Sequence, residues 1–291
     1  MVLFLLRAAP MSSVIPHNLR KQDNSPAVVA QAADYAVSVA DSFTWWWRSN
    51  GPAHVKDAAR PFAGLNVLEV GPGPTLGSSV LLACGGAQVA VADRFSPSWD
   101  ADFHAPFYRA ILDRVSERGE AYTAPIGRLL AAGDFVDDVV RRHAVAAEEL
   151  SQIGEAFDVV LSNAVLEHVQ HLQTSVANLA MVTAAGGYGF HQVDLRDHRD
   201  FNRPLEYLTL SEQEYDAIRE RTLCDSGCQW RVSSFVAAFS EAGFDTSVSV
   251  NLTAEPEYME ALRPRLHPDF AGYSDQDLMA TSAFFVLHRP R

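Results

Sequence analysis

Residues 66–77 read NVLEVGPGPTLG, an apolar run that passes directly into a turn rich in glycine and proline. The run from Asn66 to Val70 predicts a buried strand, and the apolar stretch Ser78 to Ala83 predicts a helix on the other side of the turn. Glycine permits a sharp connection with the backbone close to a ligand, and the first turn of a helix offers free N–H groups. The segment therefore predicts a strand, turn and helix that together bind a ligand.

An acidic residue follows the next predicted strand, Gln88–Ala92. Asp93 lies 20 residues after Gly73, a spacing at which a carboxylate can accept hydrogen bonds from both hydroxyls of a ribose. The turn itself reads G-x-G-x-x-x-G, one residue longer than the dinucleotide fingerprint. Glu69 lies within the first strand, where an unpaired carboxylate is costly to bury, so we expect it to accept hydrogen bonds or to face a cation. These features indicate a nucleoside ligand.

Strand and helix patterns alternate along most of the chain, which predicts a parallel sheet with helices on both faces. Helices are predicted at Ala27–Arg48 and Ser233–Ala242, and a third strand near Leu129–Ala132. The later strands are predicted at Phe157–Leu161, Tyr188–Val193, Thr246–Leu252 and Ser282–His288.

The predicted domain organisation has three parts. Residues 1–26 form a flexible leader, residues 27–64 form an amino-terminal helical cap, and residues 65–291 form the main domain with insertions at about 96–130 and 196–231. Long excursions from a compact sheet are typical of lids and binding loops. Because ligands of open α/β sheets bind beyond the carboxyl ends of the strands, both insertions can reach one site.

The composition favours a small-molecule partner in the cytoplasm. The chain has 23 Lys and Arg against 36 Asp and Glu, a net charge of −13, which repels the phosphates of nucleic acids. The apolar start Val2–Leu6 is far shorter than the roughly 18 residues of a membrane span. Three cysteines are too few for a disulfide framework, which suits a reducing compartment. The oligomeric state stays open, a homodimer included.

Three blocks resemble the class I S-adenosylmethionine-dependent methyltransferases of small molecules: VLEVGPG at 67–73, the pair Ala92-Asp93, and FDVVLSNAVLEHV at 157–169. The resemblance covers about residues 65–290. It implies a Rossmann-like, seven-stranded, mostly parallel sheet whose last strand is antiparallel, and it implies S-adenosyl-L-methionine as the cofactor.

The resemblance also implies contacts for each part of that cofactor. The methionine portion would lie between Glu69, Gly71, Pro72 and Gly73. The ribose would be held by Asp93 with Arg94 beside it, and the adenine would face Asp134 with Phe135 beside it. The remaining wall of the site would be formed by Ser162, Asn163 and Leu166.

Methyl transfer requires alignment of a nucleophile and, where needed, removal of its proton, for which histidine is suited near neutral pH. We predict that His191 and Asp194, at the end of the fifth strand, and His168, after the fourth, act as base, orienting or substrate-binding residues. Asp194, Asp197 and His198 could instead hold a divalent ion that binds a diol, or form a solvated polar turn. Ligand types alone do not establish a metal site, so the prediction includes no metal.

Aromatic residues gather in the predicted additions to the sheet. Trp45, Trp46 and Trp47 are consecutive, so on a helix at least one of them cannot share the core face with the others. The other group is spaced like one face of a helix, which favours a core position over a pocket. It consists of Trp99, Phe103, His104, Phe107 and Tyr108. Tyr207, in the second insertion, could reach the cleft.

The function predicted from the sequence is methyl transfer to a small molecule, with oxygen favoured as the acceptor atom. One alternative is an NAD-dependent dehydrogenase or epimerase, because Asp93 could hold its ribose equally well. Glu69, the longer glycine spacing and the absence of a Tyr-x-x-x-Lys pair argue against it. A second alternative is a methyltransferase-like module that binds the nucleoside without catalysis.

Overall fold

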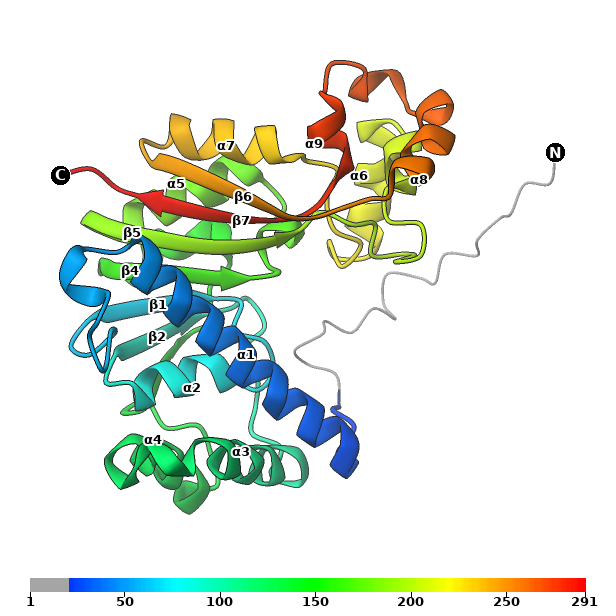
Figure 1. Ribbon diagram of the computed structural model, residues 1–291. Coiled ribbons are helices and arrows are strands. Elements are labelled where there is room, and N and C mark those ends of the chain that lie inside the picture. Colours follow the sequence, from blue (N-terminus) through cyan, green and yellow to red (C-terminus); the bar gives the residue numbers. More distant parts are fainter. Residues whose placement is uncertain (1–20) are drawn as a thin grey trace.

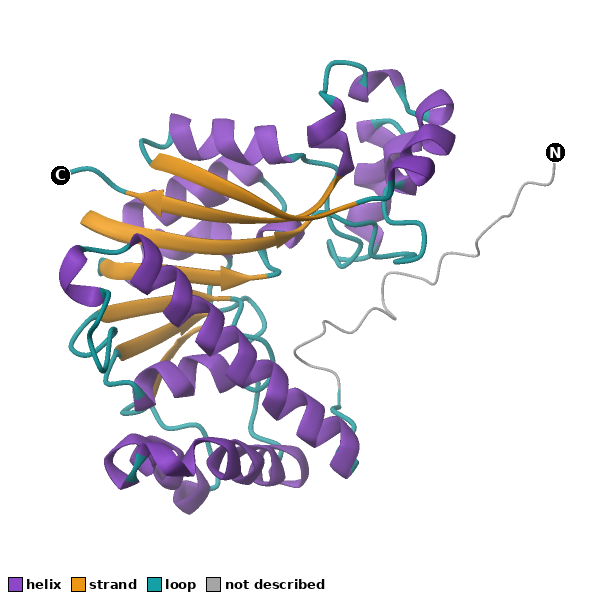
Figure 2. Cartoon of the chain, in the orientation of Figure 1, coloured by secondary structure: helices purple, strands orange, loops and turns teal. Residues whose placement is uncertain are grey.

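The computed structural model of the chain describes residues 21–291, and the predicted leader falls mostly outside them. Seven strands form one sheet in the order β3-β2-β1-β4-β5-β7-β6. Figure 2 shows the strands in orange with helices on both sides of them. β7 is antiparallel to both of its neighbours, β5 and β6, whereas the other pairings are parallel. The strands are β1 (Asn66–Val70), β2 (Gln88–Ala92), β3 (Val140–His143), β4 (Phe157–Asn163), β5 (Thr183–Asp194), β6 (Asp245–Thr253) and β7 (Ala280–His288). The predicted Rossmann-like class is confirmed, including its antiparallel last strand.

Helices cover both faces of the sheet because the buried strands alternate apolar side chains between two cores. In β1, Val67 belongs to the core under α1 to α4, whereas Leu68 and Val70 belong to the core under α5 and α7. Figure 1 shows α1 crossing the sheet in front. These helices are α1 (Pro26–Asn50), α2 (Gly77–Cys84), α3 (Ala101–Val115), α4 (Glu120–Ala132), α5 (Leu172–Val182) and α7 (Val232–Glu241).

Short 3₁₀ helices complete the connections between the larger elements. They are η3 (Ala53–Val55), η4 (Ser116–Arg118), η5 (Ala147–Ile153), η6 (Leu166–His168), η7 (Glu206–Thr209), η8 (Arg263–Arg265) and η9 (Pro268–Phe270). None of the helices within residues 21–291 combines the length and the apolarity that crossing a bilayer demands.

The predicted position of the third strand is wrong. Residues 129–132 form the last turn of α4, which ends at Ala132 and is followed by Gly133 in the left-handed conformation. The true third strand, β3, reads Val-Arg-Arg-His and lies at the edge of the sheet. An edge strand leaves its side chains partly in solvent, so β3 has none of the apolar run by which a buried strand is recognised.

The three consecutive tryptophans of α1 have different surroundings. Trp47 is buried and donates from Nε1 to the carbonyl oxygen of Pro61, at 2.8 Å. Trp46 stacks on Phe284 of β7 with 4.0 Å between the ring centroids, whereas Trp45 is 59% exposed. The helix geometry therefore separates them as predicted, and α1 shares the core of the main domain. The predicted stripe that begins at Trp99 also packs into this core.

A lobe beside the sheet has a small core of its own. It combines the insertion 196–231 with residues 254–279, a second excursion, between β6 and β7, that is not among the predicted insertions (Figure 1). Its helices are α6 (Glu212–Arg221), α8 (Pro256–Leu262) and α9 (Asp275–Met279). Tyr207 is fully buried in this core and donates its hydroxyl hydrogen to the carbonyl oxygen of Leu195, so it does not reach the cleft.

Arg231 connects this lobe to the sheet. Its guanidinium group is completely buried and donates hydrogen bonds to backbone carbonyls on both sides and to the Tyr207 hydroxyl. The carbonyl partners are Leu195, Asp277, Leu278 and Ala280. A buried cation is tolerated because these oxygen atoms replace its hydration.

We expect Arg231→Leu to lower the free energy of unfolding by about 3 kcal/mol, because it leaves several buried carbonyls and a hydroxyl without a donor. Urea denaturation measures this loss. Arg221→Leu, at an exposed position of the same lobe, is the control and should change the value by less than about 0.5 kcal/mol. Equal losses in the two variants would contradict the role assigned to Arg231.

Candidate functional site

A cavity of about 480 Å³ opens at the carboxyl ends of β1, β2 and β4. Its walls come from the turn after β1 and from the loops after β2, β3 and β4. Two further segments close it: α1, through Tyr35, Ala36 and Val39, and the 196–231 insertion, through His198 and the loop at 222–225. The volume and the partly apolar lining are those of a small-molecule site.

The glycine turn forms the floor of this cavity. Gly71 and Gly73 have φ values of +63° and +72°, in the left-handed region that favours glycine. A Cβ atom on Gly71 would lie 2.5 Å from Cγ2 of Val165, which follows β4. One on Gly73 would meet nothing within 4 Å in the described chain. Gly71 therefore permits close packing of two loops, and Gly73 leaves space in the cavity.

The first insertion supports this turn from behind instead of covering the site. His104 of α3 accepts a hydrogen bond at Nδ1 from the Asp100 backbone N–H, so its Nε2 carries the hydrogen that is donated to the Pro74 carbonyl oxygen, at 3.0 Å. Tyr108 donates to the carbonyl oxygen of Thr75, at 2.6 Å. The prediction that both insertions cover the site therefore holds only for 196–231.

Glu69 lies on the cavity wall and is 2% exposed. Strand alternation directs its side chain toward α2, where its carboxylate accepts hydrogen bonds from the hydroxyls of Ser78, at 2.7 Å, and of Ser79. Burial raises the pKa of Glu69, and the two serine hydroxyls oppose that rise. This is the hydrogen-bonded carboxylate that its place within a strand leads us to expect.

Other predicted cofactor residues also line the cavity: Pro72, Asp93, Arg94 and Asn163. Asp93 accepts a hydrogen bond at Oδ1 from the backbone N–H of Phe95, at 2.7 Å. Asn163 donates to the hydroxyl of Tyr35 on α1, at 2.7 Å. Tyr35 lines the cavity but was not predicted from the sequence, since a single tyrosine on a long helix carries no signal of its own.

Four predicted cofactor residues do not line the cavity. Ser162 is buried with its hydroxyl 2.8 Å from Nδ1 of His191, and Leu166 is a core residue. Phe135 is buried against Trp99. Asp134 is exposed and precedes β3, whereas the cavity wall is formed by residues 145–148, which follow it. The error in Asp134 and Phe135 comes directly from the misplaced third strand.

Two of the predicted catalytic residues are also held away from the cavity. His191 is 1% exposed and stacks on Phe239 of α7, and burial lowers its pKa to about 3. Asp194 binds Arg196, with 2.8 Å between Oδ1 and Nε. Although burial raises the pKa of Asp194, the hydrogen bonds from Arg196 and the imidazole of His198, whose Nε2 lies 3.6 Å from Oδ2, hold it below its ordinary value. Neither residue is placed to accept a proton from a ligand in the cavity.

His168 is the one predicted catalytic residue that lines the cavity in the described part of the chain. Its Nδ1 donates a hydrogen bond to the carbonyl oxygen of Cys224, at 2.7 Å, which leaves Nε2 as the nitrogen with a free lone pair in the neutral ring. Burial lowers the pKa of His168, so the ring is neutral at pH 7. His168 therefore offers a lone pair to a proton or a cation.

The diol-binding metal set considered from the sequence is not assembled. The Asp194 carboxylate is bound by Arg196, and the Asp197 carboxylate is buried and bound by Arg199, with 2.6 Å between Oδ2 and the guanidinium. Of the three residues, only His198 lines the cavity.

Strained backbone surrounds the cavity. Positive φ values at residues other than glycine occur, within residues 21–291, at Leu76, Ala164, Leu223 and Cys224. Ala164 and Leu223 line the cavity, and the other two are next to lining residues. Strain of this kind concentrates at functional sites, where the surrounding structure imposes it.

The sheet order, the glycine turn and the acidic residue after β2 define the class I methyltransferase architecture. The sequence model of the methyltransferase domain family matches residues 39–247, more than half of the chain. The chain therefore belongs to this methyltransferase family, and the resemblance to the S-adenosylmethionine-dependent enzymes is confirmed. The dehydrogenase alternative does not agree with this membership.

Two curated relatives are named ubiquinone biosynthesis O-methyltransferase. The protein of Mesorhizobium japonicum is 27% identical over 168 residues, which cover 50% of this chain and 56% of the relative. The protein of Rhizobium etli is 30% identical over 133 residues, covering 46% and 42%. The chain thus matches about half the length of each relative.

Solved structures of methyltransferases show distant similarity. A phosphoethanolamine N-methyltransferase 2 of Haemonchus contortus is 17% identical, with 86% of this chain and 56% of that one covered and a TM-score of 0.41. A SAM-dependent methyltransferase of Thermotoga maritima is 14% identical, with 90% and 91% covered and a TM-score of 0.43.

We expect Gly71→Ala and Gly73→Ala to differ in stability. Gly71→Ala combines an unfavourable φ with a collision against Val165 and should cost more than about 2 kcal/mol of unfolding free energy. Gly73→Ala has only the unfavourable φ and should cost about 1 kcal/mol. Urea denaturation of both variants measures the difference, and a larger loss for Gly73→Ala would refute the packing role of Gly71.

Proposed function

We propose that this chain transfers a methyl group from S-adenosyl-L-methionine to an oxygen atom of a small-molecule acceptor. The observation that carries the proposal is the single cavity wall that joins Glu69 and Asp93 to His168 and Tyr35. It places the residues suited to a nucleoside and an amino acid beside polar groups suited to a second ligand. The names of the two curated relatives support oxygen as the acceptor atom.

The residues of the cavity fit this cofactor. Glu69 provides a buried carboxylate for an ammonium group, and Asp93 provides acceptors for ribose hydroxyls. The apolar residues Val145, Ala146 and Ala147 provide a surface for a base, in place of the predicted Asp134 and Phe135. The space in front of Gly73 would be filled by a side chain at that position. When bound, the cofactor supplies an activated methyl group on a sulfonium.

The chain's own contribution to the reaction is to position the acceptor and exclude water. Tyr35 and Asn163 join α1 to the end of β4 across the cavity, and the 222–225 loop closes the side near His168. The lone pair on Nε2 of His168 is the basic group on this side of the cavity. We infer that the acceptor hydroxyl lies between Tyr35 and His168.

The acceptor itself is proposed only by class. The net charge of −13 and the partly apolar cavity favour a neutral or cationic small molecule over a polyanion. The cytoplasmic location and the domain boundaries at 27–64 and 65–291 stay predictions.

We expect Asp93→Ala to weaken binding of S-adenosyl-L-methionine by about 10- to 100-fold, because hydrogen bonds to a charged acceptor are lost. Isothermal calorimetry measures the affinity. Asp134→Ala removes an exposed carboxylate outside the cavity and should leave it unchanged. The reverse pattern would restore the adenine role predicted for Asp134 and reject the ribose role of Asp93.

The affinity for S-adenosyl-L-methionine should also depend on pH through Glu69. Only the ionised carboxylate attracts an ammonium group, and burial raises the pKa of Glu69 above its ordinary value of 4.5, so affinity should fall as the pH is lowered toward that raised pKa. Glu69→Gln should bind weakly at pH 7 and lose this dependence. Calorimetry between about pH 8 and pH 5 tests both points, and a Glu69→Gln variant with the same pH profile as the unaltered protein would contradict them.

A further inference from the structure

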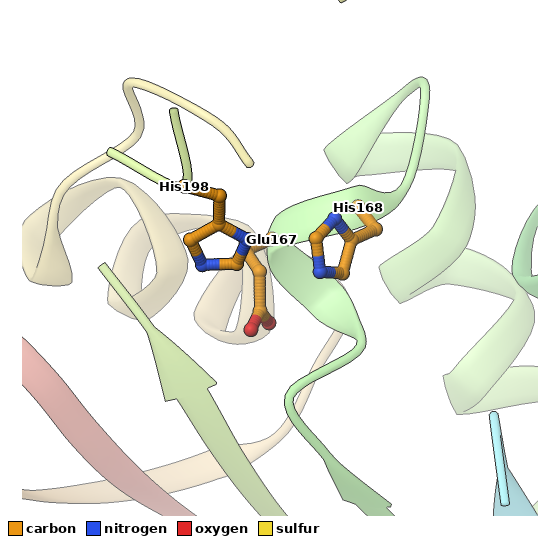
Figure 3. Close-up of side chains that lie close together, drawn as sticks. All are labelled: Glu167, His168 and His198. Carbon is orange, nitrogen blue, oxygen red and sulfur yellow. The ribbon is translucent and has the colours of Figure 1, made fainter. Parts of the chain in front are cut away.

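Three side chains that the proposed function leaves without a complete role meet at the edge of the cavity. Glu167 and His168 belong to η6, which directly follows β4, and His198 belongs to the loop after β5. One ligand atom from each lies within 4.8 Å of the others. Figure 3 shows the two imidazole rings and the carboxylate turned toward a common space. Two histidines and a carboxylate are a ligand set of divalent transition metals.

Two of these side chains have polar atoms that are buried and make no hydrogen bond within residues 21–291. Glu167 is fully buried, and although its Oε1 accepts a hydrogen bond from the Asp194 backbone N–H at 3.1 Å, its Oε2 has no hydrogen-bond partner in residues 21–291. Nε2 of His198 is likewise buried and without a hydrogen bond in that part of the chain. A buried carboxylate oxygen left unpaired is costly, so both atoms point to an additional cation between them.

His168 is oriented as a metal-binding histidine is. A metal-ligating imidazole characteristically donates its other ring N–H to a carbonyl or a carboxylate, which fixes the ring and directs its lone pair to the metal. The hydrogen bond from Nδ1 of His168 to the Cys224 carbonyl does this. That carbonyl is held by a backbone with φ values of +51° at Leu223 and +63° at Cys224.

The competing arrangement is an ion pair between His198 and Asp194. Nε2 of His198 lies 3.6 Å from Oδ2 of Asp194, but that carboxylate already receives hydrogen bonds from the Arg196 guanidinium on both of its oxygens. An ion pair with Asp194 would also leave Oε2 of Glu167 unpaired. A metal ion between the three side chains satisfies both buried atoms.

We propose that Glu167, His168 and His198 bind one divalent transition-metal ion, with an open coordination position toward the cavity. Three protein ligands with an open position are the arrangement of catalytic rather than structural metal sites. His168 and His198 both line the cavity, so a ligand in the cavity can reach the ion. This proposal departs from the sequence-based prediction, which included no metal. Its ligands share only His198 with the alternative metal set of Asp194, Asp197 and His198.

The role of this ion in the reaction rests on the proposed function. An acceptor hydroxyl bound to the ion has a lowered pKa and loses its proton to water. Its oxygen then forms a bond to the methyl carbon as the carbon–sulfur bond breaks, and the electron pair of that bond stays on sulfur. His168 would then act as a ligand and not as the base.

Titration of the metal-free full chain with Co²⁺ tests the site, because the visible absorption of Co²⁺ reports nitrogen and oxygen ligands directly. We expect one Co²⁺ per chain, and we expect His198→Gln and Glu167→Gln to weaken its binding by at least about 100-fold. His171→Gln, an exposed histidine three residues from His168, is the matched control and should bind as the unaltered chain does. Circular dichroism and thermal unfolding establish that each variant is folded.

Absence of Co²⁺ absorption in the unaltered chain, a band that survives in His198→Gln, or an equal loss in His171→Gln would overturn the proposal. Calorimetry with S-adenosyl-L-methionine on the same metal-free chain separates the two hypotheses. Cofactor binding without Co²⁺ binding rejects the metal site and leaves the proposed function standing. Co²⁺ binding without cofactor binding rejects the proposed function and leaves the metal site.

Discussion

The close approach of Gly71 to Val165 is the contact on which the site depends. It brings together the loop after β1 and the loop after β4, which lie side by side because their strands are hydrogen-bonded in parallel. Side chains in these loops come from positions about 90 residues apart in the chain. A Cβ atom at residue 71 would lie 2.5 Å from Cγ2 of Val165, so it would force the two loops that line the cavity apart.

The interior of the sheet and one edge strand, β6, were predictable from the sequence, whereas the other edge strand, β3, was not. β1 and β2 were predicted at their observed bounds because they are short apolar runs followed by glycine or an acidic residue. The position of β3 was not predicted because an edge strand need not be apolar, and Arg141 to His143 give no strand pattern. The residues predicted to face the adenine followed that error, since their position was taken relative to the third strand.

The predicted catalytic residues show what periodicity can and cannot decide. Alternation along β5 correctly places His191 and Asp194 on opposite faces of the strand, but it does not say that α7 covers the face of His191. Nor does the sequence show that His198 meets Glu167, because that contact depends on β4 and β5 being neighbours with their loops at one edge. Half of the lobe, residues 254–279, was not predicted for a related reason. It lies between β6 and β7, and the sequence does not show that these two strands pair with each other.

The residues in the left-handed conformation around the cavity limit how far the stability of this protein can be raised without altering the cavity. Ala164, Leu223 and Cys224 each hold a conformation that an L-residue adopts at a cost of about 1 kcal/mol or more, and glycine at any of them would relieve it. Selection for thermal stability alone would therefore favour substitutions in the loops that line the cavity. A backbone without this strain would be more stable but would hold the lining residues less precisely. Substitutions intended to raise the stability of this protein are therefore better made in the helices that cover the sheet than in the loops that line the cavity.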